Sequence, residues 1–208
     1  MFILFFFFYT KKNKLSSIKR VDIKKGDLAF LPFVFIAFSN FLVVFISGFE
    51  KLDISTNYIL KYLLFYALVA LNEELVFRVV VNGELLKYQP RLKSIIISSA
   101  IFGLIHLVNI NSLGSIPYVL LQVLYSFGFG LVLSLIYTYT SNIIYVFLLH
   151  FLFDYLNGFL AVELYDFEYN LWFYLVNIII SVVFALYGLY TYKKKEKEVL
   201  DASKNMDI

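Results

Sequence analysis

Six long apolar stretches separate the charged residues of this 208-residue chain, and they constrain its fold more than any other feature. They cover residues 28–49, 57–80, 94–110, 116–139, 142–161 and 170–192. A helix of about 20 apolar residues crosses the roughly 30 Å hydrocarbon core of a bilayer. The stretches are continuous and do not alternate, which indicates helices, and a helix satisfies its own backbone hydrogen bonds within lipid. The sequence therefore predicts an all-α, polytopic membrane protein with about six transmembrane helices.

The composition agrees with a bilayer as the solvent for most of the chain. Hydrophobic residues make up 61% of the sequence, whereas a soluble domain is about 45–50% apolar. The chain contains no cysteine, which excludes disulfides, thiolate metal sites and a cysteine nucleophile. We expect one integral membrane domain over residues 28–192, an N-terminal segment over 1–27 and a charged tail over 193–208. The apolar run Met1–Tyr9 is too short to span a bilayer and is interpreted as an interfacial anchor.

Basic residues are concentrated in alternate loops. They lie before the first span, between the second and third spans, and after the sixth: Lys11, Lys12, Lys14, Lys19, Arg20, Lys24 and Lys25, then Lys87, Arg91 and Lys93, then Lys193, Lys194, Lys195, Lys197 and Lys204. The loops on the other side carry Lys51 together with Glu50, Asp53, Glu163, Asp166 and Glu168. The positive-inside rule places both termini in the cytosol, and an even number of spans requires the termini to share a side. The high content of Phe, Lys, Ile and Asn favours a bacterial plasma membrane.

Ionisable side chains occur inside three of the predicted spans, where each costs roughly 2.5 kcal/mol or more to bury. Such residues are candidates for function by default. The second span contains Glu73, Glu74 and Arg78, the third His106, and the fifth His150 and Asp154. Carboxylates and imidazoles together can activate water, so hydrolysis within the membrane is the leading hypothesis.

Helical spacing places residues four apart on one face of each span. Glu74 and Arg78 can therefore form an ion pair, while Glu73 lies about 100° around the helix and faces another neighbour. His150 and Asp154 also share a face. Taken one at a time, an ion pair, a buried histidine or a His–Asp contact is compatible with a purely structural role.

The depths of these groups in the membrane favour a joint site. At about 1.5 Å per residue, Glu73 is about 21 Å from Lys87, His106 about 19 Å from Lys93, and Asp154 about 19 Å from Ser141. On the same scale His150 is shallower, about 13 Å from Ser141. We expect these groups to converge in one layer of the bundle core, in a site that opens toward the cytosol.

Other hydrolase motifs are absent from the sequence. There is no His-Glu-x-x-His zinc helix, no Gly-x-Gly-Asp aspartyl motif and no Gly-x-Ser-x-Gly nucleophile elbow. Ser126 and Gly130 form a small-xxx-small pair, which predicts close helix packing and no catalytic role.

Taken together, the motif residues resemble the CPBP family, which includes CAAX proteases and bacteriocin-processing enzymes and is also called the Abi family. Glu73-Glu74-x-x-x-Arg78, Phe102-x-x-x-His106 and His150-x-x-x-Asp154 occur in the family's order, within residues 72–158. The resemblance implies an intramembrane endopeptidase in which Glu73 and His106 activate the attacking water. It also implies that His150 and Asp154 stabilise the oxyanion and that the Glu74–Arg78 pair holds the motif helix in place.

The chain departs from the CAAX proteases at Asp154, where those enzymes carry asparagine. An amide can donate a hydrogen bond to an oxyanion, whereas an ionised carboxylate can only accept one. Our hypothesis is that Asp154 orients His150 and favours its protonated form, which leaves the imidazole as the oxyanion donor.

A metal ion is a second open point, because the family is often labelled as metalloproteases. Glu73, His106 and His150 could hold zinc in a three-ligand open site. The motif spacing is not that of a zinc helix, so we favour catalysis without a cofactor.

The sequence therefore predicts an intramembrane endopeptidase that acts on a peptide or lipidated protein at the bilayer, with no nucleic acid involved. Its substrate is expected to be CAAX-type or to resemble a bacteriocin or pheromone. Two alternatives stay open: a non-catalytic immunity or scaffold protein that retains the motifs, and a proton-coupled transporter. Pro32, Pro90 and Pro117 lie at span edges or loops, which disfavours the broken helices of a transporter.

Overall fold

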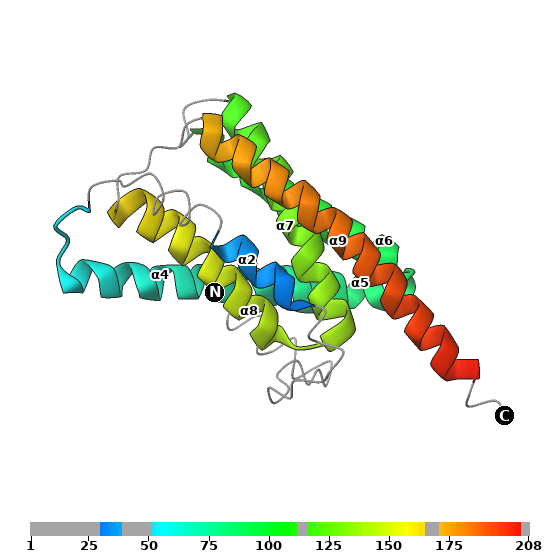
Figure 1. Cartoon of the computed structure of the whole chain (residues 1–208). Helices are drawn as coiled ribbons and strands as arrows, with labels where there is room; N and C mark the ends of the chain where they lie inside the picture. Colours follow the sequence, from blue (N-terminus) through cyan, green and yellow to red (C-terminus); the bar gives the residue numbers. More distant parts are fainter. Residues whose placement is uncertain (1–29, 39–50, 112–115, 165–170, 205–208) are drawn as a thin grey trace.

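The computed structural model describes residues 30–38, 51–111, 116–164 and 171–204 (Figure 1). Within these ranges the chain is helical and contains no strand, which confirms the all-α prediction. The N-terminal segment 1–27, with the anchor expected at Met1–Tyr9, lies outside the described residues, as does most of the first expected span. Of that span, the helix α2 (Val34–Ala37) is described.

The helices begin and end where the sequence offers caps and breaks. A continuous helical segment consists of α4 (Thr56–Glu74), the π-helical η2 (Leu75–Asn82) and α5 (Gly83–Tyr88). The Ser55 side chain accepts a hydrogen bond from the Tyr58 amide at the start of α4, and Pro90 separates α5 from α6. Asn142 caps α8 in the same way as Ser55 caps α4, by accepting from the Ile144 amide at 3.0 Å.

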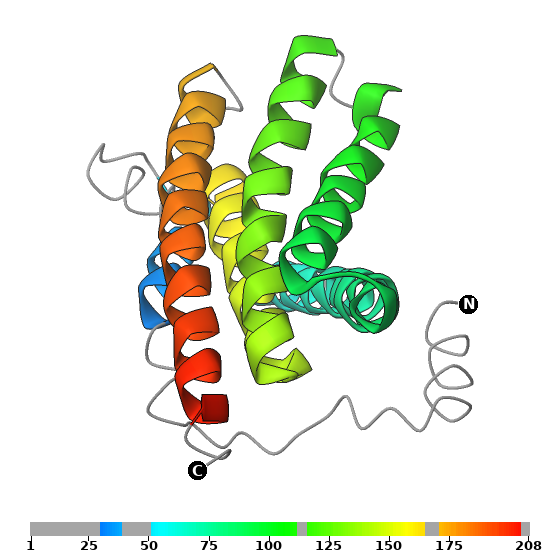
Figure 2. The ribbon, with the colours of Figure 1, turned by 90° about the vertical axis from the view of Figure 1, so that its right-hand side faces the viewer.

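The remaining helices follow in chain order: α6 (Arg91–Ile105), the 3₁₀ segment η3 (His106–Asn111), α7 (Ile116–Thr140), α8 (Ile143–Asp154), the π-helical η4 (Tyr155–Leu164) and α9 (Leu171–Lys204). Helix α7 packs between α6 and α9, and α8 packs against α4. Figure 2 shows α6, α7 and α9 side by side, and Figure 1 shows the α4–α5 segment running obliquely to α7 and α9.

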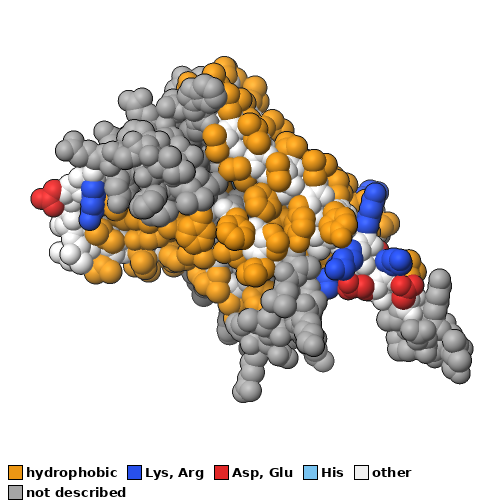
Figure 3. Space-filling view, viewed as in Figure 1, with side chains coloured by type: hydrophobic (Ala, Val, Ile, Leu, Met, Phe, Trp, Pro, Cys, Tyr) orange, Lys and Arg blue, Asp and Glu red, His pale blue; other side chains and the backbone are white. Residues whose placement is uncertain are grey.

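Four of these helices are long and apolar enough to cross a membrane: Arg91–Asn111, Ile116–Thr140, Ile143–Leu160 and Tyr174–Glu198. They correspond to the third to sixth expected spans, and the predicted number of six is not confirmed. The second expected span lies in the α4–η2–α5 segment, where Lys61, Glu73, Glu74 and Arg78 interrupt the apolar sequence. Figure 3 shows an extended apolar surface on this face of the molecule, with lysine and arginine side chains gathered near the end of α9.

Small residues let α7 approach its neighbours closely. A Cβ atom added to Gly130 would lie 3.0 Å from the Phe102 ring and 3.3 Å from Ser99, so Gly130 has the packing role that the sequence predicts. A Cβ atom on Gly128 would lie only 2.5 Å from Cβ of Ser181 on α9. The Ser181 hydroxyl also donates to the carbonyl oxygen of Tyr125 at 3.1 Å, which joins α9 to α7.

We expect Gly128→Ala to destabilise the protein by about 1–3 kcal/mol, because overpacking a close helix contact forces the helices apart. The control is Gly188→Ala on α9, whose Cβ would meet its nearest atom at an ordinary 3.6 Å. Thermal unfolding in detergent measures both. Equal melting temperatures for the two variants would show that the α7–α9 contact tolerates an added methyl group.

Candidate active site

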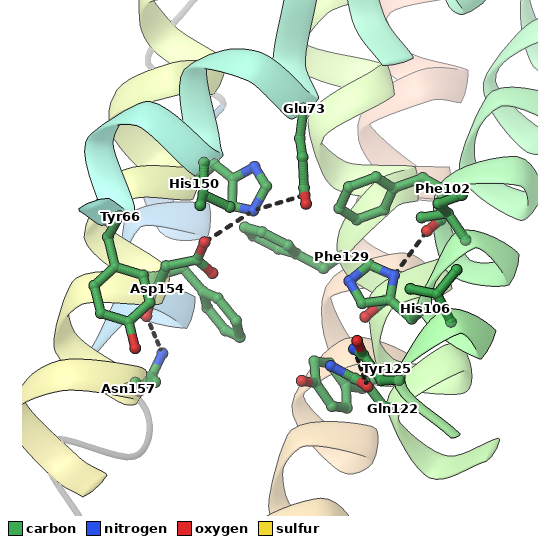
Figure 4. A pocket seen from close by; sticks show the side chains of 17 residues that line it. Tyr66, Glu73, Phe102, His106, Gln122, Tyr125, Phe129, His150, Asp154 and Asn157 are labelled. Atoms are coloured by element: carbon green, nitrogen blue, oxygen red, sulfur yellow. Dashed lines mark hydrogen bonds and ion pairs between the residues drawn. The ribbon is translucent and has the colours of Figure 1, made fainter. Parts of the chain in front are cut away.

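The three sequence motifs meet in one pocket of about 300 Å³ (Figure 4). Its lining includes Glu73 from α4, Phe102 from α6, His106 from the start of η3, and His150 and Asp154 from α8. These positions are far apart in sequence, and three helices bring them together. The expectation that the polar groups share one layer of the bundle therefore agrees with the structure.

His150 is the centre of the cluster. Its Nδ1 donates to Oε1 of Glu74 at 2.8 Å, and its Nε2 lies 3.8 Å from Oε2 of Glu73 and 3.4 Å from Oδ2 of Asp154. Since Nδ1 is occupied by Glu74, the Nε2 edge of the ring is the one presented to the pocket. Three carboxylates around one buried imidazole stabilise a positive charge on it.

Glu74 and Arg78 form a fully buried ion pair behind this cluster. Arg78 Nε donates to Oε2 of Glu74 at 2.9 Å, and both side chains are 0% exposed. Arg78 Nη1 donates to the Ser134 hydroxyl on α7 at 3.2 Å, and Ser99 on α6 donates to the same hydroxyl at 3.2 Å. The predicted Glu74–Arg78 pair is confirmed, and its network ties α4 and η2 to α6 and α7.

The contact of Glu74 with His150 is a feature that the sequence analysis missed. The two adjacent glutamates differ in their surroundings, because Glu74 is fully buried whereas the Glu73 side chain is 28% exposed. Helical periodicity predicts that they face different neighbours but not which of them holds the histidine. The position of α8 relative to α4 decides that point.

His106 begins the 3₁₀ segment η3 at the other side of the pocket. Its Nδ1 lies 2.9 Å from the carbonyl oxygen of Phe102. A carbonyl can only accept a hydrogen bond, so Nδ1 carries the proton and Nε2 of the neutral ring is left as an acceptor. His106 is thereby held in the tautomer that can accept a proton from water.

Aromatic rings fix the orientation of both histidines. The Phe102 ring lies edge-on to His106 at 5.3 Å and to His150 at 5.8 Å between centroids. Phe129 on α7 contacts His150 at 5.4 Å, and the Arg78 guanidinium lies 4.6 Å from the centre of the Phe102 ring. Phe102 therefore packs against both histidines and the buried arginine at once.

Several uncharged polar residues that were not singled out from the sequence also line the pocket: Tyr66, Asn109, Gln122, Tyr125 and Asn157. Asn109 Nδ2 donates to Oε1 of Gln122 at 3.0 Å, which connects η3 to α7. Gln122 and Asn157 carry amide side chains inside apolar stretches, and this feature of the sequence could have marked them as candidate pocket residues. Ser126, predicted only to pack helices, contributes to the pocket wall.

The direction in which the site opens relative to the membrane stays a prediction. The pocket-lining residues of α6 and η3 lie between Phe102 and Asn109, and those of α7 between Gln122 and Phe129. On these elements they lie in the part of the helix farther from Arg91 and Lys93 at the start of α6. Depth counted from one end of each helix contains no information about which side of the layer is closed.

Glu73, His106 and His150 are the residues that a zinc ion would need. Among the described residues, no group of three or more His, Asp or Glu side chains is arranged to hold a metal ion. Nδ1 of each histidine is engaged by the protein itself, His150 with Glu74 and His106 with Phe102, which leaves each Nε2 as the nitrogen available to the pocket. Catalysis without a cofactor stays a prediction, and no step below is routed through a metal.

Comparison with known protein families gives one match. The family model described as Type II CAAX prenyl endopeptidase Rce1-like matches residues 55–156. The matched segment begins at the cap of α4 and contains all three motifs. No curated protein and no solved structure matches the chain.

We expect Arg78→Met to destabilise the protein by about 3–5 kcal/mol, because it leaves Glu74 buried without its cation. The double variant Glu74→Gln/Arg78→Met removes both charges and should recover part of that loss. Arg91→Met is the control, since Arg91 is 47% exposed in its pair with Glu196 and an exposed pair contributes at most about 1 kcal/mol. Thermal unfolding in detergent measures all three. If Arg78→Met and Arg91→Met have the same melting temperature, the buried network is not required for stability.

Proposed function

The chain belongs to the type II CAAX prenyl endopeptidase Rce1-like family, and from this we propose that it is an intramembrane endopeptidase that cleaves a membrane-associated peptide. The observation that carries the proposal is the convergence of Glu73, His106, His150 and Asp154 on one pocket from three helices. The pocket lies between helices that are apolar enough to cross a membrane. Hydrolysis there requires activated water and a donor for the oxyanion.

Glu73 is the proposed general base. Its side chain is 28% exposed in the pocket, so water can reach the carboxylate, whereas the adjacent Glu74 is sealed behind it. Glu73 takes a proton from a water molecule while His106 accepts the second hydrogen bond of that water through Nε2. The water oxygen then attacks the carbonyl carbon of the scissile peptide bond.

His150 is the proposed oxyanion donor. Its Nδ1–H is anchored on Glu74 at 2.8 Å, so a proton on Nε2 points into the pocket and can bind the oxygen that becomes negative. When the C–N bond breaks, Glu73 returns the proton that it took from water to the leaving nitrogen. Each bond made and broken is thus accounted for by side chains and one water molecule, and we propose that no metal takes part.

Asp154 is proposed to support His150 and not to bind the oxyanion itself. Its Oδ2 lies 3.4 Å from Nε2 of His150. An ionised carboxylate repels an oxyanion but stabilises the imidazolium form of the ring beside it.

The proposed substrate is a peptide that bears a lipid or an apolar segment, of the CAAX type or similar to a bacteriocin or pheromone. Support comes from the wall of the pocket, where the apolar Ile105 and Val108 are 47% and 70% exposed beside polar residues. A peptide with one apolar and one polar side fits such a lining.

We expect Glu73→Gln to abolish cleavage, because an amide cannot accept a proton from water at this step. Peptide-terminus mapping of membranes and medium, from cells that express matched amounts of each protein, detects the products. Glu84→Gln is the control on the same helical segment, since the Glu84 side chain is 36% exposed, pairs with Lys87 across one turn and does not line the pocket. Identical termini with the wild type and Glu73→Gln would favour the alternative of a non-catalytic immunity or scaffold protein.

We expect Asp154→Asn to reduce the cleavage rate by no more than about ten-fold, whereas His150→Gln should reduce it by roughly 10²–10³-fold, as loss of an oxyanion donor does. The products identified by terminus mapping provide the assay substrate. A near-complete loss of activity in Asp154→Asn would contradict the division of roles between the two residues.

A further inference from the structure

The pocket lies nearer to one end of the bundle on three of the elements that contribute to it. On α6, η3 and α7 its residues lie in the part of the helix farther from the lysine-rich end, whereas on the continuous α4–η2–α5 and α8–η4 segments they lie near the middle. On α4 they lie between Tyr66 and Glu73, on α6 and η3 between Phe102 and Asn109, on α7 between Gln122 and Phe129, and on α8 and η4 between His150 and Gly158.

The pocket is closed toward the other end of the bundle. Glu74, Arg78, Ser99 and Ser134 form the hydrogen-bonded layer behind His150, and all four are 0% exposed. Asn82, one turn beyond Arg78, is also fully buried. Water or substrate approaching from that side would have to cross this layer.

Exposure increases toward the α6–α7 connection. The side chain of His150 is 4% exposed, those of Asp154 and Glu73 are 20% and 28% exposed, and Val108 on η3 is 70% exposed. The rim of the pocket is therefore formed by η3 and its surroundings, and its floor by the buried layer around Arg78.

Charge distinguishes the two ends of the bundle. The end beyond the floor carries Lys87, Arg91 and Lys93 between α5 and α6, and Lys193, Lys194, Lys195 and Lys197 on α9. The end nearer the rim carries Lys51 and Lys61 with Asp53. By the positive-inside rule, the lysine-rich end faces the cytosol.

We propose that the pocket opens toward the non-cytosolic side of the membrane, so that its substrate is an exported peptide or the exported segment of a membrane protein. The choice of substrate rests on the proposed function. The direction of opening does not, because it follows from the lining residues and the charges alone.

The test uses the natural absence of cysteine from the chain, which makes every single-cysteine variant a specific probe. Ser126→Cys places a thiol in the pocket wall, and Val108→Cys places one at the rim. Lys194→Cys and Asp53→Cys report the two ends of the bundle. Each full-length variant is treated with a membrane-impermeant, positively charged methanethiosulfonate in right-side-out spheroplasts and in inside-out vesicles. Elution of each variant as a single peak in detergent verifies folding.

The expected result is modification of the Asp53, Val108 and Ser126 variants in spheroplasts, and of the Lys194 variant only in inside-out vesicles. If Asp53→Cys is modified in spheroplasts but Val108→Cys and Ser126→Cys are modified only in inside-out vesicles, the pocket opens to the cytosol and the proposal is wrong. Modification of Lys194→Cys in spheroplasts would overturn the orientation and the proposal with it. Val108→Cys decides the outcome if the buried Ser126→Cys does not fold. Because no cleavage is measured, failure of the proposed function would not alter these results.

Discussion

The buried pair of Glu74 and Arg78 is the interaction on which the rest of the site depends. Removing two charges from water is costly, and their attraction offsets that cost only when the remaining donors and acceptors are also bonded. Here Glu74 uses its second oxygen for His150, and Arg78 bonds Ser134 through Nη1. The guanidinium also lies over the Phe102 ring, while its buried Nη2 has no hydrogen-bond partner among the described residues. One ion pair therefore sets the positions of a histidine, an aromatic ring and a neighbouring helix at the same time.

The same arrangement divides the work between two adjacent glutamates. Glu74 is fully buried and holds His150, whereas Glu73 is partly exposed and faces the pocket. Two neighbouring residues on a helix differ by about 100° in direction. One side chain can therefore point into the protein interior while the next points into the pocket. In the proposed reaction, the buried carboxylate of Glu74 orients the imidazole of His150, while the accessible carboxylate of Glu73 accepts a proton from water.

The helix that carries Glu73 and Glu74 changes geometry within its motif, and the helix that carries His150 and Asp154 changes geometry directly after its motif. Helix α4 becomes π-helical at Leu75, and α8 becomes π-helical at Tyr155. Such segments are uncommon and are frequent at functional sites. They alter the angular positions of the residues that follow, including Arg78. Four-residue spacing on an ideal helix predicts the Glu74–Arg78 contact correctly but cannot predict this change in winding.

The sequence by itself determined the helical class and the apolar lengths, and it singled out ionisable residues that the structure brings to one pocket. Continuous apolar stretches and costly buried charges are local properties that need no knowledge of packing. The sequence also predicted the Glu74–Arg78 pair, which lies within one helical turn. Only the tertiary structure decided that Glu74 holds His150, that Gln122 and Asn109 share the pocket, and that the closed floor lies on the lysine-rich side. These features depend on contacts between helices far apart in sequence, and depth counted along single helices contains no information about which side of a layer is filled.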